Sequence, residues 1–373
     1  IMITWCKKCI LPSTRPNLVI GKDGVCNACK NHEKKIKIDW TKRKKNLDKI
    51  LTKIKKNNKS NYDCVLPVSG GKDSTWLAIK ALEFGLKPLA VTWKTPFRNS
   101  LGNQNLKNLI SLGVDHIDWT NNPIIEKKFI YESFKIFGST AIPMHLSIYN
   151  IPLIVASTMK IPIVFFAENS AYEYGYQNHS LDGYKMTKKF AKTFGVNFDT
   201  TASYWIKKGF KKKDLINYYA LNKSKNKVLR IFLGHFIKWD PKKIYQQVKK
   251  HGFKSASKPK TGLYNFADID DDFISIHHWL KWYKFGFLRK FDNLSLEIRN
   301  NRLSRTNALK MISPKDTRPP KADIKKLCNY LGIEDKRFYK LAEKFRNKNI
   351  WKKKNKKWFI QNFIKKQWEW NEN

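Results

Sequence analysis

The sequence has no run of about twenty apolar residues, and its N-terminal residues do not combine a basic segment with an apolar core. We therefore expect no transmembrane segment and no secretory signal, and we expect a cytoplasmic protein. Cysteine is scarce, with six among 373 residues, and four of the six fall in two CxxC pairs. In a reducing compartment this pattern indicates a metal site rather than disulfides.

Arginine is also scarce, because only eleven of the 74 basic residues are arginines although the formal charge is +44. Proteins that read phosphates or bases usually rely on the bidentate guanidinium group. A charge of this sign suits nucleic acid, an anionic membrane surface or phosphate-rich substrates. However, lysine is spread along the whole chain, with denser stretches at 34–59 and 336–366. A solvated, lysine-biased surface explains most of the charge, and nucleic acid stays an open but less favoured partner.

The length allows two domains that each bury a core, and an apolar fraction of 42% argues against general disorder. Composition and hydrophobic pattern divide the chain into five segments. We predict a four-cysteine zinc ribbon at 1–33, a basic helical connector at 34–61, an ATP-binding domain at 62–205, a helical substrate or partner region at 206–335, and a basic aromatic tail of one or two surface helices at 336–373.

The segment 62–205 alternates short apolar runs with helical stretches, which is typical of an α/β fold with a parallel sheet. Helical patterns dominate after residue 205, and strand signals fade there. The predicted strands are Cys64 to Val68, Leu89 to Trp93, His116 to Trp119 and Ile161 to Phe166.

A glycine-containing loop lies directly after the first of these strands and directly before a predicted helix. Paired glycines let the backbone turn tightly and approach a phosphate, so that amides at the helix start can donate to its oxygens. The serines add hydroxyl donors, the lysine adds a cation, and the aspartate can hold magnesium. The loop consists of Ser69, Gly70, Gly71, Lys72, Asp73 and Ser74.

The hexapeptide SGGKDS fits neither GxxxxGK[ST] nor GxGxxG. It resembles the PP-loop of the N-type ATP pyrophosphatases. That resemblance implies a loop that binds the β and γ phosphates of ATP as a leaving unit, so that the products are AMP and pyrophosphate. It also implies that Thr92 and Trp93 line the adenine, because nucleotides bind at the carboxyl ends of strands in such sheets.

The two CxxC pairs are Cys6 with Cys9 and Cys26 with Cys29, separated by sixteen residues. Four thiolates at this spacing can close a tetrahedral zinc site, and a closed site is structural because no position is left for water. The zinc would order a segment too small to build its own core.

PP-loop enzymes with an N-terminal zinc ribbon include tRNA thiolases, and the +44 charge is compatible with that class. Sulfur transfer calls for a further reactive cysteine or a cluster-binding set. The remaining cysteines are Cys64, in the middle of a predicted buried strand, and a lone Cys328. A 2-thiolation-type tRNA-modifying enzyme is therefore the alternative, and a nucleotide-binding module without catalysis ranks below it.

The order of motifs resembles the N-acetyl sugar amidotransferase family. These enzymes of bacterial O-antigen and of pseudaminic or legionaminic acid synthesis turn an acetamido group into an acetamidino group. The resemblance runs from Cys6 to about Arg305. The matching stretches are CKKCILPSTRPN, GVCNAC, DCVLPVSGGKDS, VTWKTP, LGNQNLKNL, GVDHIDWT, VFFAENSAYEYG, LGHFIKWDP and HHWLKWYKFGFLR.

The resemblance implies catalytic roles for Lys72 and Asp73, with Asp73 holding magnesium, and for two residues after the fourth predicted strand. Glu168 would bind magnesium or orient the amine, and Asn169 would hold a sugar hydroxyl; the alternative is that these two residues form a helix cap or a turn. Ala167 stands where the family pattern implies a glycine. Basic residues of the C-terminal half would clamp a nucleotide-sugar or a sugar carboxylate. These are Lys284, Arg289, Arg302 and Arg305.

The implied reaction uses ATP and Mg²⁺ to adenylate the acetamido oxygen, after which ammonia displaces AMP. The chain shows no N-terminal cysteine nucleophile and no GxCxG-like elbow, so it lacks glutaminase equipment. We therefore expect a separate glutaminase subunit to supply ammonia, and the resemblance adds a second, synthase-like partner.

Overall fold

The computed structural model describes residues 2–175, 183–187, 190, 199–219, 228–355 and 357–370. A sheet of five strands lies at its centre, in the order β3-β2-β1-β4-β5, and every neighbouring pair is parallel. The strands are β1 (Cys64–Pro67), β2 (Pro88–Trp93), β3 (Asp115–Trp119), β4 (Ile163–Phe166) and β5 (Leu229–Phe232). The predicted α/β fold with a parallel sheet is confirmed.

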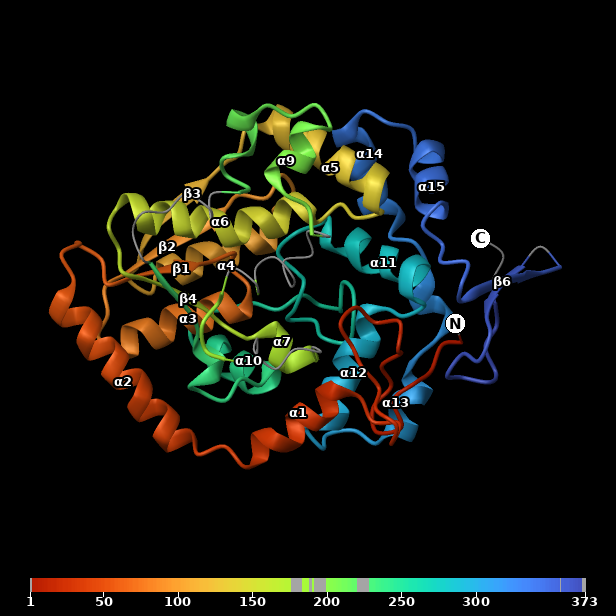
Figure 1. The fold of residues 1–373 in the computed structure, drawn as a ribbon, viewed down its shortest axis with the longest axis horizontal. Coiled ribbons are helices and arrows are strands. Elements are labelled where there is room, and N and C mark those ends of the chain that lie inside the picture. The colour runs from red at the N-terminus through yellow and green to blue at the C-terminus, as the bar shows by residue number, and fades with distance from the viewer. Residues whose placement is uncertain are drawn as a thin grey trace.

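Helices cover both faces of the sheet, as Figure 1 shows. Successive strand residues point to opposite faces, so Leu66 packs with the core under α3 and α10, while Val65 packs with the core under α6. The chain crosses between the faces where the strand order reverses, between β1 and β4. The helices of this part are α3 (Lys72–Glu83), α4 (Ser100–Ile110), α5 (Pro123–Phe137), α6 (Ile142–Thr158), α7 (Ser170–Tyr174), α9 (Ala202–Ile206) and α10 (Pro241–Lys249).

The four-cysteine segment does not stand apart from the rest of the molecule. Its cysteines share one apolar core with the helices that follow α10, and the first red segment lies against these blue helices in Figure 1. The predicted connector is helical, and Leu47 and Leu51 bury one side of it in the core of the sheet domain. The helices are α1 (Asn27–Ile36), α2 (Trp40–Asn57), α11 (Ile274–Phe285), α12 (Arg289–Arg299), α13 (Arg305–Met311), α14 (Lys321–Leu331) and α15 (Asp335–Glu343). Short 3-10 turns are η2 (Lys212–Leu215), η4 (Leu233–His235) and η5 (Pro314–Thr317).

The sheet extends beyond the boundary expected at residue 205, because β5 is its edge strand. Only Ile231 and Phe232 of this strand are fully buried, while Leu229 and Arg230 are partly exposed. A four-residue edge strand with two buried residues gives a weak pattern. Pairing with β4, from Ile163 opposite Leu229 onward, places it in the sheet.

The prediction of one or two helices after residue 336 is only partly right. Helix α15 forms at the start of the tail, but β6 (Trp351–Lys354) and β7 (Lys357–Ile360) then form an antiparallel hairpin. Asn355 adopts a left-handed φ of 47° at the turn, which asparagine tolerates. Trp351 pairs with Ile360 and both are buried. This burial outweighs the helix propensity of the lysines.

The turn between β1 and α3 depends on Gly70. Its φ is 86°, and a Cβ there would lie 2.7 Å from the backbone nitrogen of Leu106 and 3.0 Å from the carbonyl oxygen of Gly102. The loop therefore packs directly on the backbone of α4, which only glycine permits.

We predict that Gly70→Ala lowers the free energy of unfolding by roughly 1–3 kcal/mol, because it adds both backbone strain and a clash. Gly71→Ala is the matched control, since Gly71 has an ordinary φ of −68° and a Cβ would meet only the Ser69 hydroxyl, at 3.2 Å. Urea denaturation of both variants measures the difference. Equal losses of unfolding free energy in the two variants would contradict the requirement for glycine at position 70.

Candidate active site and metal centre

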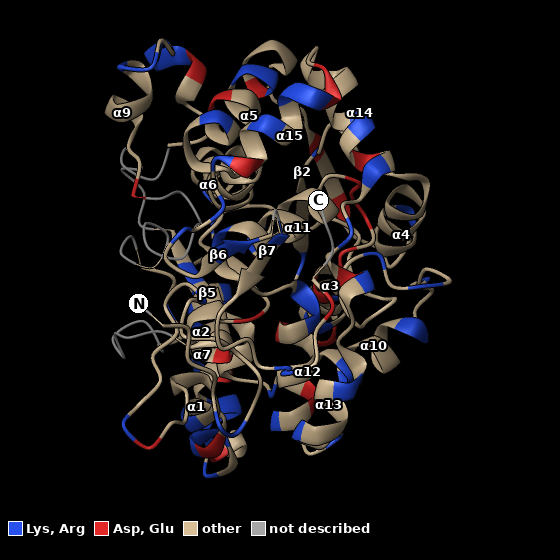
Figure 2. Cartoon of the chain, turned by 90° about the vertical axis from the view of Figure 1, so that its right-hand side faces the viewer, with Lys and Arg blue, Asp and Glu red and all other residues tan. Residues whose placement is uncertain are grey.

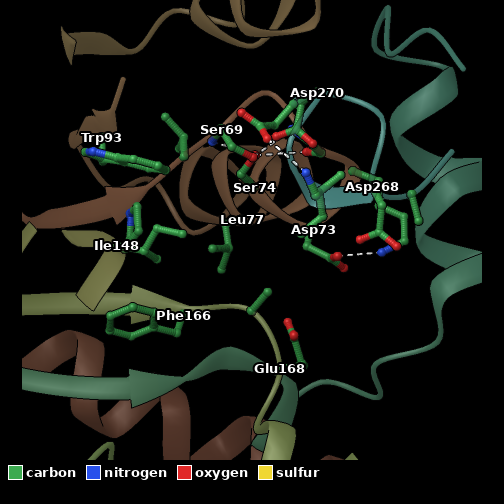
Figure 3. Close-up of a pocket in the computed structure, with 18 of the residues that line it drawn as sticks. Ser69, Asp73, Ser74, Leu77, Trp93, Ile148, Phe166, Glu168, Asp268 and Asp270 are labelled. Carbon is green, nitrogen blue, oxygen red and sulfur yellow. Dashed lines mark hydrogen bonds and ion pairs between the residues drawn. The ribbon is translucent and has the colours of Figure 1, made fainter. Parts of the chain in front are cut away.

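A cavity of about 400 Å³ opens at the carboxyl ends of β1, β2 and β4. This is the point where the strand order reverses, and parallel α/β sheets bind their ligands there. The cavity walls come from the β1–α3 loop, from α6, from the residues after β4 and from the segment 266–271 (Figure 3).

The loop is held by its own hydrogen bonds. The Ser74 hydroxyl donates to the Gly71 carbonyl at 2.9 Å and accepts from the Ser69 amide at 3.3 Å, while the Gly71 amide donates to the Ser69 hydroxyl at 3.2 Å. Helix α3 begins at Lys72, so its first turn lies at the cavity wall. Free amides and the helix dipole make such a turn an anion-binding site. The predicted phosphate loop is thus at a cavity.

Lys72 and Asp73 form an ion pair at the start of α3. Trp239 fixes this pair, because its indole nitrogen donates to Asp73 Oδ1 at 3.0 Å and its ring centroid lies 5.7 Å from the Lys72 nitrogen. Sequence reasoning did not select Trp239, although it lies in the quoted stretch LGHFIKWDP. The sequence pattern alone gave no reason to expect a contact between Trp239 and the loop.

Carboxylates crowd one wall of the cavity. The described lining residues include only two cations, Lys72 and Arg289. The run ADIDDD at 267–272 supplies most of these carboxylates, and sequence reasoning missed it even though three consecutive aspartates are an unusual signal. The lining carboxylates are Asp73, Glu168, Asp268, Asp270 and Asp271.

Crowding and burial change how these groups ionise. Burial and the nearby Asp73 raise the pKa of Glu168 to about 7. Burial likewise raises the pKa of Asp271 to about 7, against a hydrogen bond from Thr95. Burial raises the pKa of Asp270, whose carboxylate is hydrogen-bonded to Ser69. Burial opposes ionisation of Asp268 too, but Arg289 and His278 outweigh it and hold its pKa well below the usual range.

The other end of the cavity is apolar. Trp93, Ile148 and Phe166 lie together on the side of the loop away from Asp268, as Figure 3 shows. An apolar slot with an aromatic wall suits a planar base. Trp93 is thus placed where it was predicted, whereas Thr92 is buried and bonds His116 Nε2 at 2.8 Å without lining the cavity.

Glu168 lines the cavity, but its neighbour Asn169 does not. Asn169 is the N-cap of α7, accepting from the Tyr172 amide at 3.2 Å and donating to the Gly183 carbonyl at 3.0 Å. A capping side chain is not free to hold a sugar hydroxyl. Ala167 has no left-handed φ, so the local turn tolerates its methyl group.

Of the four basic residues proposed to clamp substrate, only Arg289 lines the cavity. Lys284 donates to the Gly138 carbonyl at 2.9 Å. Arg302 pairs with Glu297 and Asp240, and Arg305 donates to the Cys9 carbonyl at 3.0 Å. These three meet internal acceptors instead of a ligand space. A basic residue type alone does not distinguish a side chain that binds substrate from one that binds internal acceptors.

The four predicted zinc ligands meet in one buried cluster. Their sulfur atoms all lie within 4.8 Å of one another, and the Cys9 and Cys26 sulfurs are 3.7 Å apart. A tetrahedral site with Zn–S bonds of about 2.3 Å requires sulfurs roughly 3.8 Å apart. The Cys6 sulfur also accepts from the amides of Cys9 at 3.4 Å and Cys26 at 3.3 Å, as thiolate ligands do. The geometry therefore fits a structural Zn²⁺ bound by Cys6, Cys9, Cys26 and Cys29.

We expect one zinc ion per chain in metal analysis of the purified protein. Cys9→Ser should lose the zinc and lower the melting temperature, because a structural zinc stabilises the folded state. Cys328→Ser is the control, since Cys328 is equally buried but lies outside the cluster. Zinc retained by Cys9→Ser at the wild-type level would contradict the site.

The raised pKa of Glu168 predicts a pH-dependent stability. Because the folded pKa, about 7, lies above the ordinary value of 4.5, the stabilisation is complete below about pH 4.5 and is lost as the pH rises through about 7. Without ATP or divalent cations, the unfolding free energy of wild type should fall between about pH 5 and 8 more than that of Glu168→Gln, by on the order of 2 kcal/mol.

Urea denaturation at the two pH values measures this difference. Glu83→Gln is the control, because Glu83 is an exposed carboxylate of α3 with 51% of its side chain accessible. A pH dependence that is the same in wild type and both variants would contradict the assignment to Glu168.

Comparisons with known proteins add a family match in the C-terminal part. Residues 261–365 match the family model described as "LPS biosynthesis protein WbpG-like, C-terminal domain". No curated protein matches the chain. No helix among the described residues is both long and apolar enough for a membrane crossing.

Two solved structures are similar at low level. The NMN synthetase from Francisella tularensis is 14% identical with a TM-score of 0.27, over 60% of this chain and 99% of that one. The NH3-dependent NAD synthetase from Campylobacter jejuni subsp. jejuni NCTC 11168, in complex with the nitrate ion, is 18% identical with a TM-score of 0.31, over 58% and 96%. Neither TM-score is high enough to define a shared fold. Over residues 261–365, which include Asp268, Asp270 and Arg289 of the cavity, the chain is similar to WbpG-like proteins of LPS biosynthesis. Of the motif stretches that carry the resemblance, HHWLKWYKFGFLR lies in this range, and the match is consistent with it.

Proposed function

We propose that this protein is an ATP-dependent amidotransferase of bacterial surface polysaccharide or flagellin glycan biosynthesis. It adenylates the acetamido oxygen of an N-acetylated sugar or nucleotide-sugar and replaces that oxygen with ammonia, giving an acetamidino group, AMP and pyrophosphate. The observation that carries the proposal is one cavity that joins the SGGKDS loop, an apolar slot and a wall of carboxylates.

The cavity offers a place for each part of ATP. The slot of Trp93, Ile148 and Phe166 takes the adenine, and the first turn of α3 with Lys72 takes the terminal phosphates. The carboxylates of Asp73 and Glu168 fit Mg²⁺, because magnesium is commonly held by one or two carboxylates together with phosphate oxygens. When bound, the ion neutralises phosphate charge that the two lining cations alone do not balance.

Each proposed step has a balanced outcome. The acetamido oxygen attacks the α-phosphorus, the bond between the α and β phosphates breaks, and pyrophosphate leaves. Ammonia then attacks the imidate carbon, the bond to the AMP oxygen breaks, and the amidine forms. Glu168 serves either as a magnesium ligand or, where Asp73 alone holds the ion, as the group that accepts a proton from the attacking amine, for which a pKa of about 7 is suited. The rest of the work is positioning.

Ammonia must reach this cavity from outside the chain. We propose that a separate glutaminase subunit delivers it, with a synthase-like partner between the two. The purified chain should then use ammonium salts but not glutamine. Turnover of glutamine by the chain alone would overturn this part of the proposal.

Thiolation of tRNA remains the second candidate because of the +44 charge. Sulfur transfer needs a thiolate. Cys64 is fully buried and burial raises its thiol pKa, while burial and Asp335 raise that of Cys328 to about 12. Neither cysteine lines the cavity. These environments favour the amidotransferase.

A product assay separates the candidates. The protein is incubated with Mg²⁺, ATP and ammonium, with either an N-acetylated sugar nucleotide or tRNA, and pyrophosphate and AMP are measured. We expect pyrophosphate only with the sugar, and mass spectrometry should show exchange of oxygen for NH in that sugar. Release of ADP, or pyrophosphate only with tRNA, would refute the proposal.

Asp73→Asn should lower kcat by about 100-fold or more in this assay, as loss of a charged group at a phosphate-transfer centre does. Asp48→Asn is the control, because Asp48 is exposed on α2. Equal rates for the two variants would remove Asp73 from the mechanism.

A further inference from the structure

We propose that Arg15, which belongs to the zinc-binding segment, is a positioning residue of the cavity: it holds Arg289 in place for the sugar acceptor by sharing Asp292 and Tyr174 with it. This inference rests on the proposed function for the identity of the ligand. It assigns the four-cysteine segment a task in the active site, in addition to folding and in place of docking a nucleic acid.

A chain of charged groups leads from the zinc-binding segment to the cavity. Arg15 Nε donates to Asp292 Oδ1 at 2.8 Å. The other oxygen of Asp292 lies 3.8 Å from Arg289 Nη1, and Arg289 Nε donates to Asp268 Oδ2 at 3.0 Å. Arg289 and Asp268 both line the cavity. Arg15 is thus two contacts away from the ligand space.

The two guanidinium groups also share one aromatic ring. Arg15 lies 5.3 Å and Arg289 lies 5.9 Å from the centroid of Tyr174. Arg15 Nη1 further donates to the Tyr174 carbonyl at 3.3 Å. Tyr174 ends α7, the helix that starts directly after Glu168 and Asn169. Arg15 therefore contacts both the segment that follows Glu168 and the partner of Arg289.

The charge balance makes Arg15 necessary for the position of Arg289. Asp292 has only 1% of its side chain exposed, and burial raises its pKa, but Arg15, Lys281 and Arg289 outweigh burial and hold it at about 2. Without Arg15, the buried Asp292 carboxylate would lose its nearest hydrogen-bond donor. The penalty for a buried unpaired charge would then draw Arg289 from Asp268 towards Asp292 and out of the cavity wall.

A second set of contacts joins the same segment to α7. Lys35 of α1 pairs with the buried Glu173, and the side-chain nitrogen of Asn31 donates to the Tyr172 carbonyl at 3.4 Å. Helix α1 carries the zinc-ligand residue Cys29. The zinc-binding segment and α1 therefore contact α7, the helix that follows Glu168 at the cavity. These contacts support a positioning role for the segment.

Arg289 stands on the acceptor side of the cavity. The apolar slot of Trp93 lies on the far side of the loop from Asp268, to which Arg289 is paired (Figure 3). With adenine in the slot and the phosphates at Lys72, the wall of Asp268 and Arg289 is left for the sugar. A guanidinium there suits a carboxylate or a phosphate of the acceptor.

The test compares Arg15→Gln with Thr14→Val, its neighbour at the same interface, whose hydroxyl donates only to the Phe285 carbonyl at 2.5 Å. We expect Arg15→Gln to raise the KM for the sugar acceptor about tenfold or more, with a smaller change in the KM for ATP and with zinc content unchanged. Arg15→Lys should recover part of the loss, and Thr14→Val should behave as wild type. Arg15→Gln should add nothing further in an Arg289→Gln background.

Additive effects of the two arginine variants, or an Arg15→Gln protein with wild-type KM values, would overturn the inference. So would an effect on the KM for ATP alone. Failure of the proposed function is a separate result, because wild type itself would then release no pyrophosphate. In that case a double-mutant cycle on the unfolding midpoint decides the inference: independent effects of Arg15→Gln and Arg289→Gln would contradict it.

Discussion

The energetic constraint on this structure is the burial of like charge around one cavity. Among the described residues, five carboxylates and two cations line it. Taking a carboxylate out of water costs free energy unless a cation or hydrogen-bond donors compensate. Two of the carboxylates have such partners. Asp73 pairs with Lys72 and accepts a hydrogen bond from Trp239, and Asp268 pairs with Arg289. For Glu168 and Asp271 burial dominates: Lys72 offsets only part of it for Glu168, the Thr95 hydroxyl offsets only part of it for Asp271, and both pKa values are raised.

Glu168 and Asp271 lie beside an anion-binding turn, and two buried carboxylates there are unfavourable in the free protein. In the proposed reaction, Asp73 and Glu168 would hold a divalent cation, and the positive charge of that ion would offset both these carboxylates and the phosphates. The electrostatic cost of the free site therefore lies where the proposed cation would reduce it. Asp270 belongs to the same group, because burial raises its pKa although Ser69 of the loop is hydrogen-bonded to it.

The zinc-binding segment meets a different constraint. About thirty residues cannot bury enough apolar area to fold alone, so such segments usually need a metal or a neighbouring core. Here the cysteines form one cluster that fits a metal ion, and they also pack in the core of α11 and α12. Two hydrogen bonds to backbone carbonyls also join the segment to helices: Arg305 of α13 donates to Cys9, and Thr14 donates to Phe285 of α11. A segment held on this many sides is suited to transmit position to its neighbours.

Local patterns were enough to predict four of the five strands, the turn of the SGGKDS loop between a strand and a helix, the grouping of the four cysteines and most helices. Each of these depends on residues close in sequence: an apolar run, a glycine pair, a CxxC spacing. The residues that were missed depend on pairings across the chain. Trp239 is 166 positions from Asp73, and β5 is recognisable as a strand only beside β4. The same limit explains why Lys284, Arg302 and Arg305 looked like ligand residues, although distant carbonyls and carboxylates occupy them.

The excess of lysine now has a physical context. Figure 2 shows Lys and Arg positions, in blue, on helices throughout the molecule, and the lysines of α2 are exposed. A net charge of +44 produces a positive potential far beyond any one contact, and this draws anionic ligands towards the protein. Within the cavity the sign reverses, because its carboxylates outnumber its cations. For the proposed nucleotide substrate, the surface charge would increase the rate of encounter. Binding at the site would then require the loop amides, Lys72 and a divalent cation to overcome the local negative charge, which would make it selective.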